Sequence, residues 1–224
     1  MVPLPELFER VPDPFASFYL AERPWELLGA ALANALSDLP SGVVAGNHCK
    51  IDSGAVLEGS VYIGRDSVIK TGATITGAVI IGSGVEIRSG AVIHGGCWIG
   101  DGAVVGINTE VKHSIFLPGA RAPHLNYVGD SVLGAGVNLG AGTKLANFRN
   151  DGGEISVNGV ATGRRKLGAI LGDRVKIGCN AVTNPGCVIG TGTRVYAGIS
   201  LPGGVYPARQ LIKLRQQIDI VVLR

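Results

Sequence analysis

Aliphatic residues recur at every sixth position through the first half of the chain. From Ile51 onward, each sixth residue is Ile, Leu or Val as far as Leu117. The residue four places further along each hexad is mostly small, and Gly, Asn or Asp often falls between these two positions. This period predicts a solenoid of short parallel strands, in which large and small residues alternate as inward fillers and the turn residues take positive φ.

The hexad period also indicates how the strands are stacked. Three hexads make one triangular coil of about 18 residues, and successive coils stack at the strand spacing of about 4.8 Å. We therefore expect an all-β fold, a left-handed parallel β-helix (hexapeptide-repeat solenoid) with a short N-terminal helical arm. The left-handed assignment is based on the hexad period alone, because crossovers between parallel strands are usually right-handed. Three cysteines occupy the small inward position and are expected to be core residues: Cys49, Cys97 and Cys187.

The rhythm breaks twice after Leu117. The interval from there to Leu133 is two residues short of three hexads, and a longer interruption follows Leu145. The second break holds the sequence ISVNGVAT, in which Asn158-Gly159 is typical of the type I′ turn of a β-hairpin. We expect a hairpin or flap insertion at about 150–168 that carries positive charge on the binding face, from Arg164, Arg165 and Lys166.

The two ends of the chain lack the hexad. Residues 1–40 are predicted to form a helical arm, because PWELLGAALANALSDLPSG has an apolar face between a leading Pro and a trailing Pro and Gly. This arm is expected to cap the open end of the solenoid or to pack on a neighbouring subunit, since open strand edges invite aggregation. The β-helix domain is expected over 41–207, and 208–224 is expected to leave it as a short helix or an edge strand.

Composition and charge narrow the functional classes. Glycine is far above its usual share of about 7%, which indicates many tight turns. A net charge of +3 is too small to argue for nucleic acid and suits an anionic small molecule better. The sequence shows no signal peptide, no transmembrane segment and no CxxC spacing. We therefore expect a cytoplasmic protein with no membrane partner and no nucleic-acid partner.

The candidate chemistry lies where the rhythm first breaks, in residues 119–150. His124 follows the end of the regular frame at an outward position, and Tyr127 and Asn138 come soon after. Acyl transfer to an amine needs a base near neutral pH, donors for the oxyanion and cations for any phosphate on the acceptor. The alternatives are a surface histidine on a structural or regulatory β-helix, or a metal site. The histidines form no tight ligand pair, and no metal is predicted.

The segments RAPHLNYVGDSVLGAGVNLGAG…LANF, TGRRKLGAILGD and LPGGVYP resemble a known family. They are similar to the acetyltransferase domain of the bacterial bifunctional N-acetylglucosamine-1-phosphate uridyltransferase/glucosamine-1-phosphate acetyltransferase, and to archaeal sugar-1-phosphate nucleotidyltransferase/acetyltransferases. The resemblance spans roughly 50–207 and is densest over 108–205. It implies a homotrimer of left-handed β-helices that uses acetyl-CoA to acetylate the amine of an amino-sugar 1-phosphate, above all glucosamine-1-phosphate.

The resemblance also implies roles for individual residues. His124 would be the general base, and Asn138 the second catalytic residue, beside the sugar. The substrate-binding positions would be His94, Glu110, Lys112, Tyr127, Asn147 and Lys166. Among these, the two lysines would hold the phosphate and Glu110 would tune the base. The positions that would contact acetyl-CoA are Ala141, Cys179 and Ala197. Transfer would be direct, so Cys179 is not expected to be a nucleophile.

Three departures from the family pattern leave room for another function. No Gly-rich nucleotide-binding segment appears near the start, so we expect no nucleotidyl transfer by this chain; a separate nucleotidyltransferase would then be a partner. His94 stands where the family usually has Arg, and Phe148 stands where Tyr is common. The alternative is a non-catalytic β-helix that binds a sugar nucleotide or serves a partner enzyme.

Overall fold

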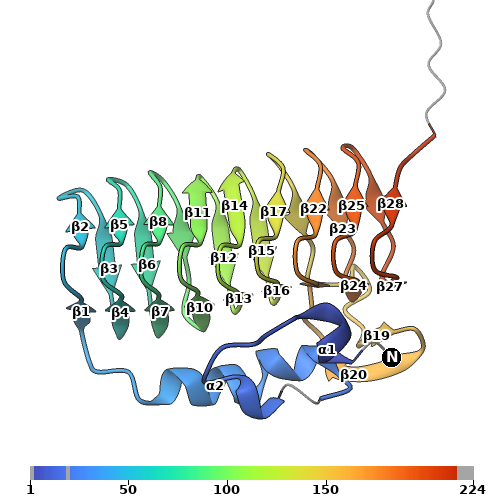
Figure 1. Ribbon diagram of the computed structural model, residues 1–224, viewed down its shortest axis with the longest axis horizontal. Coiled ribbons are helices and arrows are strands. Elements are labelled where there is room, and N and C mark those ends of the chain that lie inside the picture. Colours follow the sequence, from blue (N-terminus) through green and yellow to red (C-terminus); the bar gives the residue numbers. More distant parts are fainter. Residues whose placement is uncertain (1–2, 19–20, 216–224) are drawn as a thin grey trace, which may run out of the picture.

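The chain folds as a parallel β-solenoid, described here from a computed structural model for residues 3–18 and 21–215. Each coil contributes one short strand to each of three sheets (Figure 1). The expected all-β parallel solenoid is thus confirmed, while its hand stays a prediction. We name the sheets A, B and C in the order in which the chain enters them.

The three sheets have parallel pairing throughout. Sheet A contains β1 (Val43–Ala45), β4 (Val61–Ile63), β7 (Val79–Ile81), β10 (Cys97–Ile99), β13 (Ile115–Phe116), β16 (Val132–Leu133), β21 (Ala169–Leu171), β24 (Cys187–Ile189) and β27 (Gly204–Tyr206). Sheet B contains β2 (Lys50–Ile51), β5 (Val68–Ile69), β8 (Glu86–Ile87), β11 (Val104–Ile107), β14 (Arg121–His124), β17 (Asn138–Leu139), β22 (Lys176–Ile177), β25 (Arg194–Val195) and β28 (Leu211–Ile212). Sheet C contains β3 (Val56–Glu58), β6 (Thr74–Thr76), β9 (Val92–Ile93), β12 (Glu110–Lys112), β15 (Tyr127–Gly129), β18 (Lys144–Leu145), β23 (Val182–Thr183) and β26 (Ser200–Leu201).

A narrow aliphatic core fills the prism between the three sheets. Most of its large members are isoleucines at hexad positions, stacked one above another and fully buried. Cys97 and Cys187 are fully buried in this core, and the half-buried Cys49 packs against it. The prediction that these three cysteines are core residues is therefore confirmed. Burial raises the pKa of the Cys97 and Cys187 thiols to about 12.

The first break in the hexad rhythm consists of two deletions of one residue each, in successive coils. Ile93 pairs with Val111, three hexads further on, whereas Ile99 pairs with Phe116, one residue short of three hexads. Phe116 is fully buried in the core. The assignment of Leu117 to the inward hexad position was therefore wrong, because Leu117 packs outside the prism, under the N-terminal arm.

The missing residue comes from the turn between sheets C and A. Gly95 and Gly96 make this turn in one coil, whereas His113 alone makes it in the next, with a φ of 45°. A Cβ atom at Gly96 would collide with the imidazole of His113, so the shorter turn packs directly on glycine. The following coil repeats the short turn at Asp130, and His124 and Tyr127 both lie between these two short turns.

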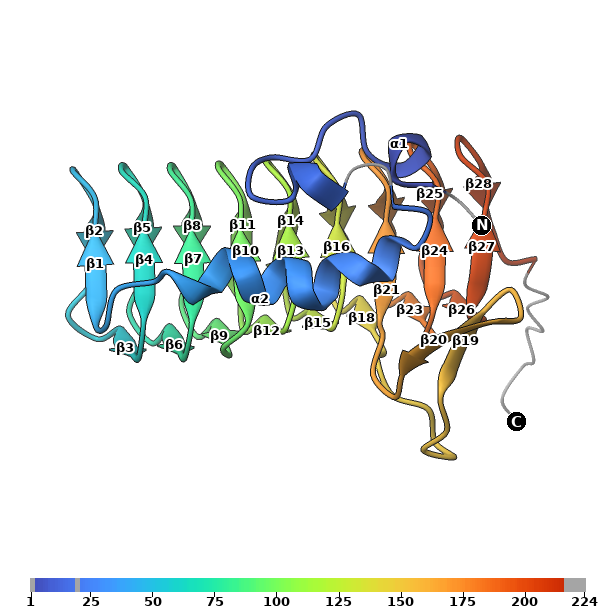
Figure 2. The same ribbon diagram turned by 90° about the horizontal axis from the view of Figure 1, so that it is seen from below.

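The N-terminal arm lies along the outer face of sheet A (Figure 2). It contains α1 (Leu4–Leu7), two 3₁₀ turns (Ala16–Phe18 and Pro24–Leu28) and α2 (Ala30–Ser37). The single amphipathic helix expected here is broken at Gly29, whose φ of −100° and ψ of −119° fall outside the helical region. Aromatic contacts anchor the arm: the Phe15 and Trp98 rings meet edge to face, 5.4 Å apart.

A buried carboxylate fastens the start of the arm to the turn between sheets A and B. Asp173 accepts hydrogen bonds from the backbone N–H of Glu9 at 2.8 Å and of Ala135 at 2.7 Å. Arg174 forms an ion pair with Glu9 at 2.6 Å. Burial raises the pKa of Asp173. The described part of the arm, residues 3–18 and 21–40, therefore packs on sheet A instead of capping the end of the prism, and it leaves the outer faces of sheets B and C uncovered.

The second break holds an antiparallel hairpin of β19 (Ile155–Val157) and β20 (Val160–Arg164). Asn158 and Gly159 both have positive φ, 46° and 78°, as a type I′ turn requires. Ile155 and Val157 are buried in the same cluster as the arm, so the hairpin is docked against the solenoid wall and is not a free flap.

The solenoid continues past residue 207, because β28 pairs with β25 inside the stretch expected to be a tail. Residues 216–224, the remainder of that stretch, lie outside the described residues. Within the part of the chain that the structure describes, no helix is long and apolar enough to cross a membrane.

Candidate functional site

One corner of the prism carries the predicted base and all three predicted acetyl-CoA positions. We call the turn from sheet B to sheet C the BC corner. Here Gly142 N–H donates to His124 O at 3.0 Å, Asn180 N–H to Ala141 O at 2.8 Å, and Gly198 N–H to Cys179 O at 2.9 Å. These ladder bonds stack four residues in successive coils: His124, Ala141, Cys179 and Ala197.

The stacked residues form an open strip. His124, Cys179 and Ala197 are exposed, and Ala141 is half-buried. Because the three residues beyond His124 have small side chains, the strip leaves room along the prism axis. The distance from Ala141 to Ala197 is two coil spacings, or about 10 Å. We call Ala141, Cys179 and Ala197 the corner strip.

A buried amide fixes the backbone that carries His124. The Asn126 side chain lies inside the prism, where its Oδ1 accepts from the His124 N–H at 3.1 Å and its Nδ2 donates to Gly140 O at 2.7 Å. One side chain thus ties the His124 turn to the first turn of the corner strip. On the other side, Gly106 leaves no space for a side chain, because a Cβ there would lie 1.6 Å from the Pro123 carbonyl oxygen.

Next to this corner, sheet C carries a chain of three polar side chains. The Tyr127 hydroxyl donates to Asn147 Oδ1 at 3.3 Å, and Asn147 Nδ2 donates to Asp130 Oδ2 at 2.6 Å. Asp130 is buried. Burial, and then the nearby Glu110, raise the pKa of Tyr127, so its hydroxyl stays protonated at neutral pH. Because the hydroxyl hydrogen is engaged in the hydrogen bond to Asn147, the hydroxyl oxygen can accept a hydrogen bond from a ligand.

Gly129 makes this polar chain possible. A Cβ atom at position 129 would lie 2.6 Å from Asn147 Nδ2 and 2.7 Å from the Tyr127 hydroxyl. The two side chains therefore meet in the space that glycine leaves on the outer face of sheet C.

The predicted phosphate residues approach the same end of sheet C. Lys112 pairs with Gly129 in the neighbouring coil. Lys166 forms an antiparallel bridge with Phe148, and the next residue, Leu167, donates its N–H to Asn147 O at 2.9 Å. Lys112 and Lys166 therefore come from two separate segments that meet beside the chain of Tyr127, Asn147 and Asp130.

Two predicted residues pair with each other instead of with the base. His94 Nε2 lies 3.1 Å from Glu110 Oε1, on sheet C. Glu110 is also the register partner of Tyr127. Among the described residues the Glu110 side chain pairs with His94 and not with His124, which gives no support to the expected tuning of His124, and Glu110 raises the pKa of Tyr127.

Asn138 lies on a different face from Tyr127. It belongs to sheet B, where its register partners are Arg121 and Lys176. Within sheet B, Asn138 stacks on Arg121, three residues before His124 at the BC corner, whereas Tyr127 follows the corner on sheet C. A single prism therefore does not gather all the predicted residues around one cavity.

Sequence reasoning missed Asn126, Asp130 and Leu125. The signal for Asn126 was a polar residue in an inward column, between Thr109 and Thr143, and all three are buried. Leu125 was visible only as an apolar residue at a turn. In the structure it has a φ of 52° and is 58% exposed, next to His124.

Comparison with known proteins identifies relatives of this arrangement. Residues 42–77 match the family model described as bacterial transferase hexapeptide (six repeats). The chain is 47% identical over 98 residues to a bifunctional sugar-1-phosphate nucleotidylyltransferase/acetyltransferase of Sulfurisphaera tokodaii, a match that covers 42% of this chain and 24% of the relative. It is 39% identical over 181 residues to the bifunctional protein GlmU of Methanococcus aeolicus, covering 78% of this chain and 42% of the relative.

The resemblance read from the sequence is therefore confirmed: this chain contains bacterial transferase hexapeptide repeats and is similar to the bifunctional sugar-1-phosphate nucleotidylyltransferase/acetyltransferases. It spans less than half of the length of these curated relatives.

Proposed function

We propose that this chain is an acetyl-CoA-dependent N-acetyltransferase that acts on the amine of an amino-sugar 1-phosphate unit, as in glucosamine-1-phosphate. The observation that carries the proposal is the stacking of exposed His124 on the corner strip of small residues, three residues before Tyr127, whose hydroxyl is fixed by Asn147. The similarity to a bifunctional sugar-1-phosphate nucleotidylyltransferase/acetyltransferase supports it.

The donor would lie along the corner strip. A thioester on a long, thin carrier fits a strip of small side chains that runs straight to a base, because such a strip holds the reactive carbonyl within reach of one fixed imidazole. Cys179 lies within the strip, two coils from His124. In this proposal Cys179 lines the path of coenzyme A and forms no covalent intermediate.

The reaction would proceed by direct transfer. The amine nitrogen attacks the thioester carbon, the new C–N bond forms, and the C–S bond breaks. His124 takes the proton from the attacking amine and returns it to the leaving sulfur, so the products are the amide and the free thiol of coenzyme A. An imidazole suits this role because it exchanges a proton near neutral pH.

The acceptor would lie on sheet C, with its phosphate near Lys112 and Lys166 and a sugar hydroxyl on Tyr127. Lysine ammonium groups are suitable phosphate ligands. Asn138 lies on sheet B, so its proposed contact with a sugar on sheet C requires a neighbouring copy. A homotrimer, with each site in a groove between two prisms, supplies that copy and uses the two faces that the arm does not cover.

A thiol-release assay with acetyl-CoA and a panel of amino-sugar phosphates tests the activity. We expect His124→Ala to lower kcat by about 10²–10⁴, because the base is lost, while the affinity for coenzyme A is kept. His113→Ala is the matched control, since His113 is also exposed but lies on the turn between sheets C and A. A His124→Ala enzyme with full kcat would contradict the assignment.

The alternative, a β-helix that binds a sugar nucleotide without catalysis, gives a different pattern of ligand stabilisation. A rise in the melting temperature with acetyl-CoA supports the enzyme, whereas a rise with UDP-sugars alone supports the binding module.

A further inference from the structure

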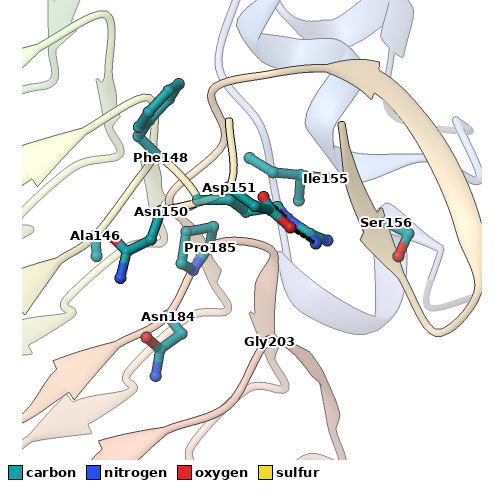
Figure 3. A pocket seen from close by; sticks show the side chains of 10 residues that line it. Ala146, Phe148, Asn150, Asp151, Ile155, Ser156, Asn184, Pro185 and Gly203 are labelled. Carbon is teal, nitrogen blue, oxygen red and sulfur yellow. Dashed lines mark hydrogen bonds and ion pairs between the residues drawn. The ribbon is translucent and has the colours of Figure 1, made fainter. Parts of the chain in front are cut away.

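A cavity separate from the corner strip lies where the chain leaves sheet C. The cavity has a volume of about 600 Å³, which falls within the range of ordinary ligand pockets, about 300–1,000 Å³. Its floor is Ala146 and Asn184, which directly follow the paired strands β18 and β23 (Figure 3). Its wall is the loop of Phe148, Arg149, Asn150 and Asp151.

The two charged side chains of this wall form an ion pair with each other. Arg149 donates through Nε to Asp151 Oδ1 at 2.9 Å, and its second nitrogen contacts the other carboxylate oxygen. Asp151 Oδ1 also accepts from the Gly153 N–H at 3.0 Å. The hydrogen bonds and charge of Arg149 lower the pKa of Asp151, so the ion pair persists across the neutral range. The interior of the cavity is therefore polar but carries no net charge.

The remaining groups suit a flat, polar ring. Figure 3 shows the Asn150 and Asn184 amides on the same side of the cavity as Ala146. Amides present a donor and an acceptor side by side, the pattern that base edges match. Phe148, whose ring is 46% exposed, offers an apolar face on which a base can stack.

Two basic residues lie next to the loop that forms the wall. The Arg165 Nε donates to Gly152 O at 3.0 Å, which holds its guanidinium beside the loop, and Lys166 bridges Phe148. Neither Arg165 nor Lys166 forms an ion pair with another described residue. Phosphate oxygens beside this loop would meet two unpaired positive charges.

The position of the cavity relative to the acceptor follows from the register. Val128 pairs with Leu145, so Ala146 lies one coil beyond Gly129, where the Tyr127–Asn147 contact is made. The corner strip runs along the edge where the chain enters sheet C, and the cavity lies along the edge where the chain leaves it. A group in the cavity would therefore extend the acceptor past its phosphate, and would not overlap the donor.

We infer that this cavity binds the nucleoside of a nucleoside diphosphate, so that the preferred acceptor is a nucleotide-linked amino sugar and not the bare sugar 1-phosphate. The base occupies the neutral, amide-lined interior, and the diphosphate lies between Arg165, Lys166 and Lys112. This inference rests on the proposed function for its reaction, but the nucleotide site itself is independent of catalysis.

Calorimetric titration of the intact protein tests the site without catalysis. The ligands are UDP, ADP, GDP, dTDP and inorganic pyrophosphate. We expect at least one nucleoside diphosphate to bind at least tenfold tighter than pyrophosphate. Ala146→Phe, which fills the floor, should remove that gain, and Ala161→Phe is the matched control on the exposed face of the hairpin. Phe148→Ala, at an exposed position, gives a second test that does not crowd the floor.

Equal affinity for pyrophosphate and every nucleoside diphosphate would overturn the inference, as would unchanged nucleotide binding in both cavity variants. Adenosine 3′,5′-bisphosphate, the nucleotide end of coenzyme A, is the remaining ligand: if Ala146→Phe weakens its binding, the cavity belongs to the donor and the assignment to the acceptor is wrong.

Acylation assays separate this inference from the proposed function. If glucosamine-1-phosphate is acetylated with the same kcat/KM as its nucleoside diphosphate form, the function stands and the cavity assignment fails. If nucleoside diphosphates bind as expected but no amino sugar is acetylated, the cavity assignment stands and the proposed function fails.

Discussion

Leu125 is a residue whose type conflicts with the backbone it occupies. Its equivalents at the BC corner are glycine or asparagine with positive φ, as in Gly90, Asn108, Gly142 and Asn180. A left-handed backbone costs a bulky L-residue about 1–2 kcal/mol, and strain of this kind collects at functional sites. The side chain is 58% exposed within the chain, so little burial offsets this cost.

We therefore expect Leu125→Asn to raise the stability of an isolated chain by about 1 kcal/mol and to lower kcat or weaken self-association. Asparagine tolerates this φ, whereas the contact that the leucine makes with an acceptor or a neighbouring copy is lost. Urea denaturation measures the first effect, and light scattering with turnover measures the second. Unchanged activity and association together with raised stability would mean that Leu125 has no functional contact.

The role of Gly129 can also be tested by substitution. Its φ is one that any residue adopts, so a larger residue there would affect only the space beside it. A methyl group there would push apart the ends of the Tyr127 and Asn147 side chains. We expect Gly129→Ala to keep the fold, with a melting temperature close to that of the parent. It should raise KM for the acceptor several-fold more than KM for acetyl-CoA, since only sheet C is disturbed. An equal rise in both KM values would count against a role for Tyr127 in acceptor binding.

At the scale of elements, the sequence predicted the strands well because each strand repeats one inward rule. The prediction failed where two adjacent residues are both apolar, because either of them could have been the inward one. Phe116 and Leu117 are adjacent and both apolar, so the shorter turn at His113 could not be read from hydrophobicity. The helix broken at Gly29 shows the same limit, because its packing on sheet A overrides its periodic pattern.

The candidate site was predictable in composition but not in arrangement. The residues of the corner strip came from the resemblance, and their stacking emerges only from the ladder of coils. Asn126 escaped notice because an inward amide is judged by its partners, here the His124 N–H and Gly140 O, and these are set by the turns of two different coils.

The corner strip makes a prediction about thiol chemistry. Cys179 is exposed, whereas Cys97 and Cys187 are fully buried with pKa values of about 12, so at pH 8 these two remain protonated and shielded. We expect rapid alkylation at Cys179, which Cys179→Ser removes. Desulfo-coenzyme A should slow this alkylation at least fivefold if the donor lies along the strip, as mass spectrometry of the labelled peptide can report. An alkylation rate at Cys179 that stays unchanged at a saturating concentration of the donor analogue would argue against that path.

At the scale of the whole molecule, the arm and hairpin settle which surfaces are available. Both pack on the sheet A side and share one apolar cluster with it, separate from the prism core. Sheets B and C are left for ligands and for other copies of the chain. The predicted site residues begin only at His94, so the coils from β1 to β6 contribute none of them.

Those early coils repeat one another and hold no predicted site residue, so we expect that one of them can be removed without loss of the site. Excising residues 50–67 removes one full turn and joins Cys49 to Val68 with every later side chain still in phase. We expect such a shortened protein to fold with a lower melting temperature and to keep its kcat, as circular dichroism and turnover would measure. Excising residues 50–66 instead throws the junction out of phase by one residue, which turns inward side chains outward at that coil. The length of this prism would then be a quantity that can be edited in whole turns without touching its chemistry.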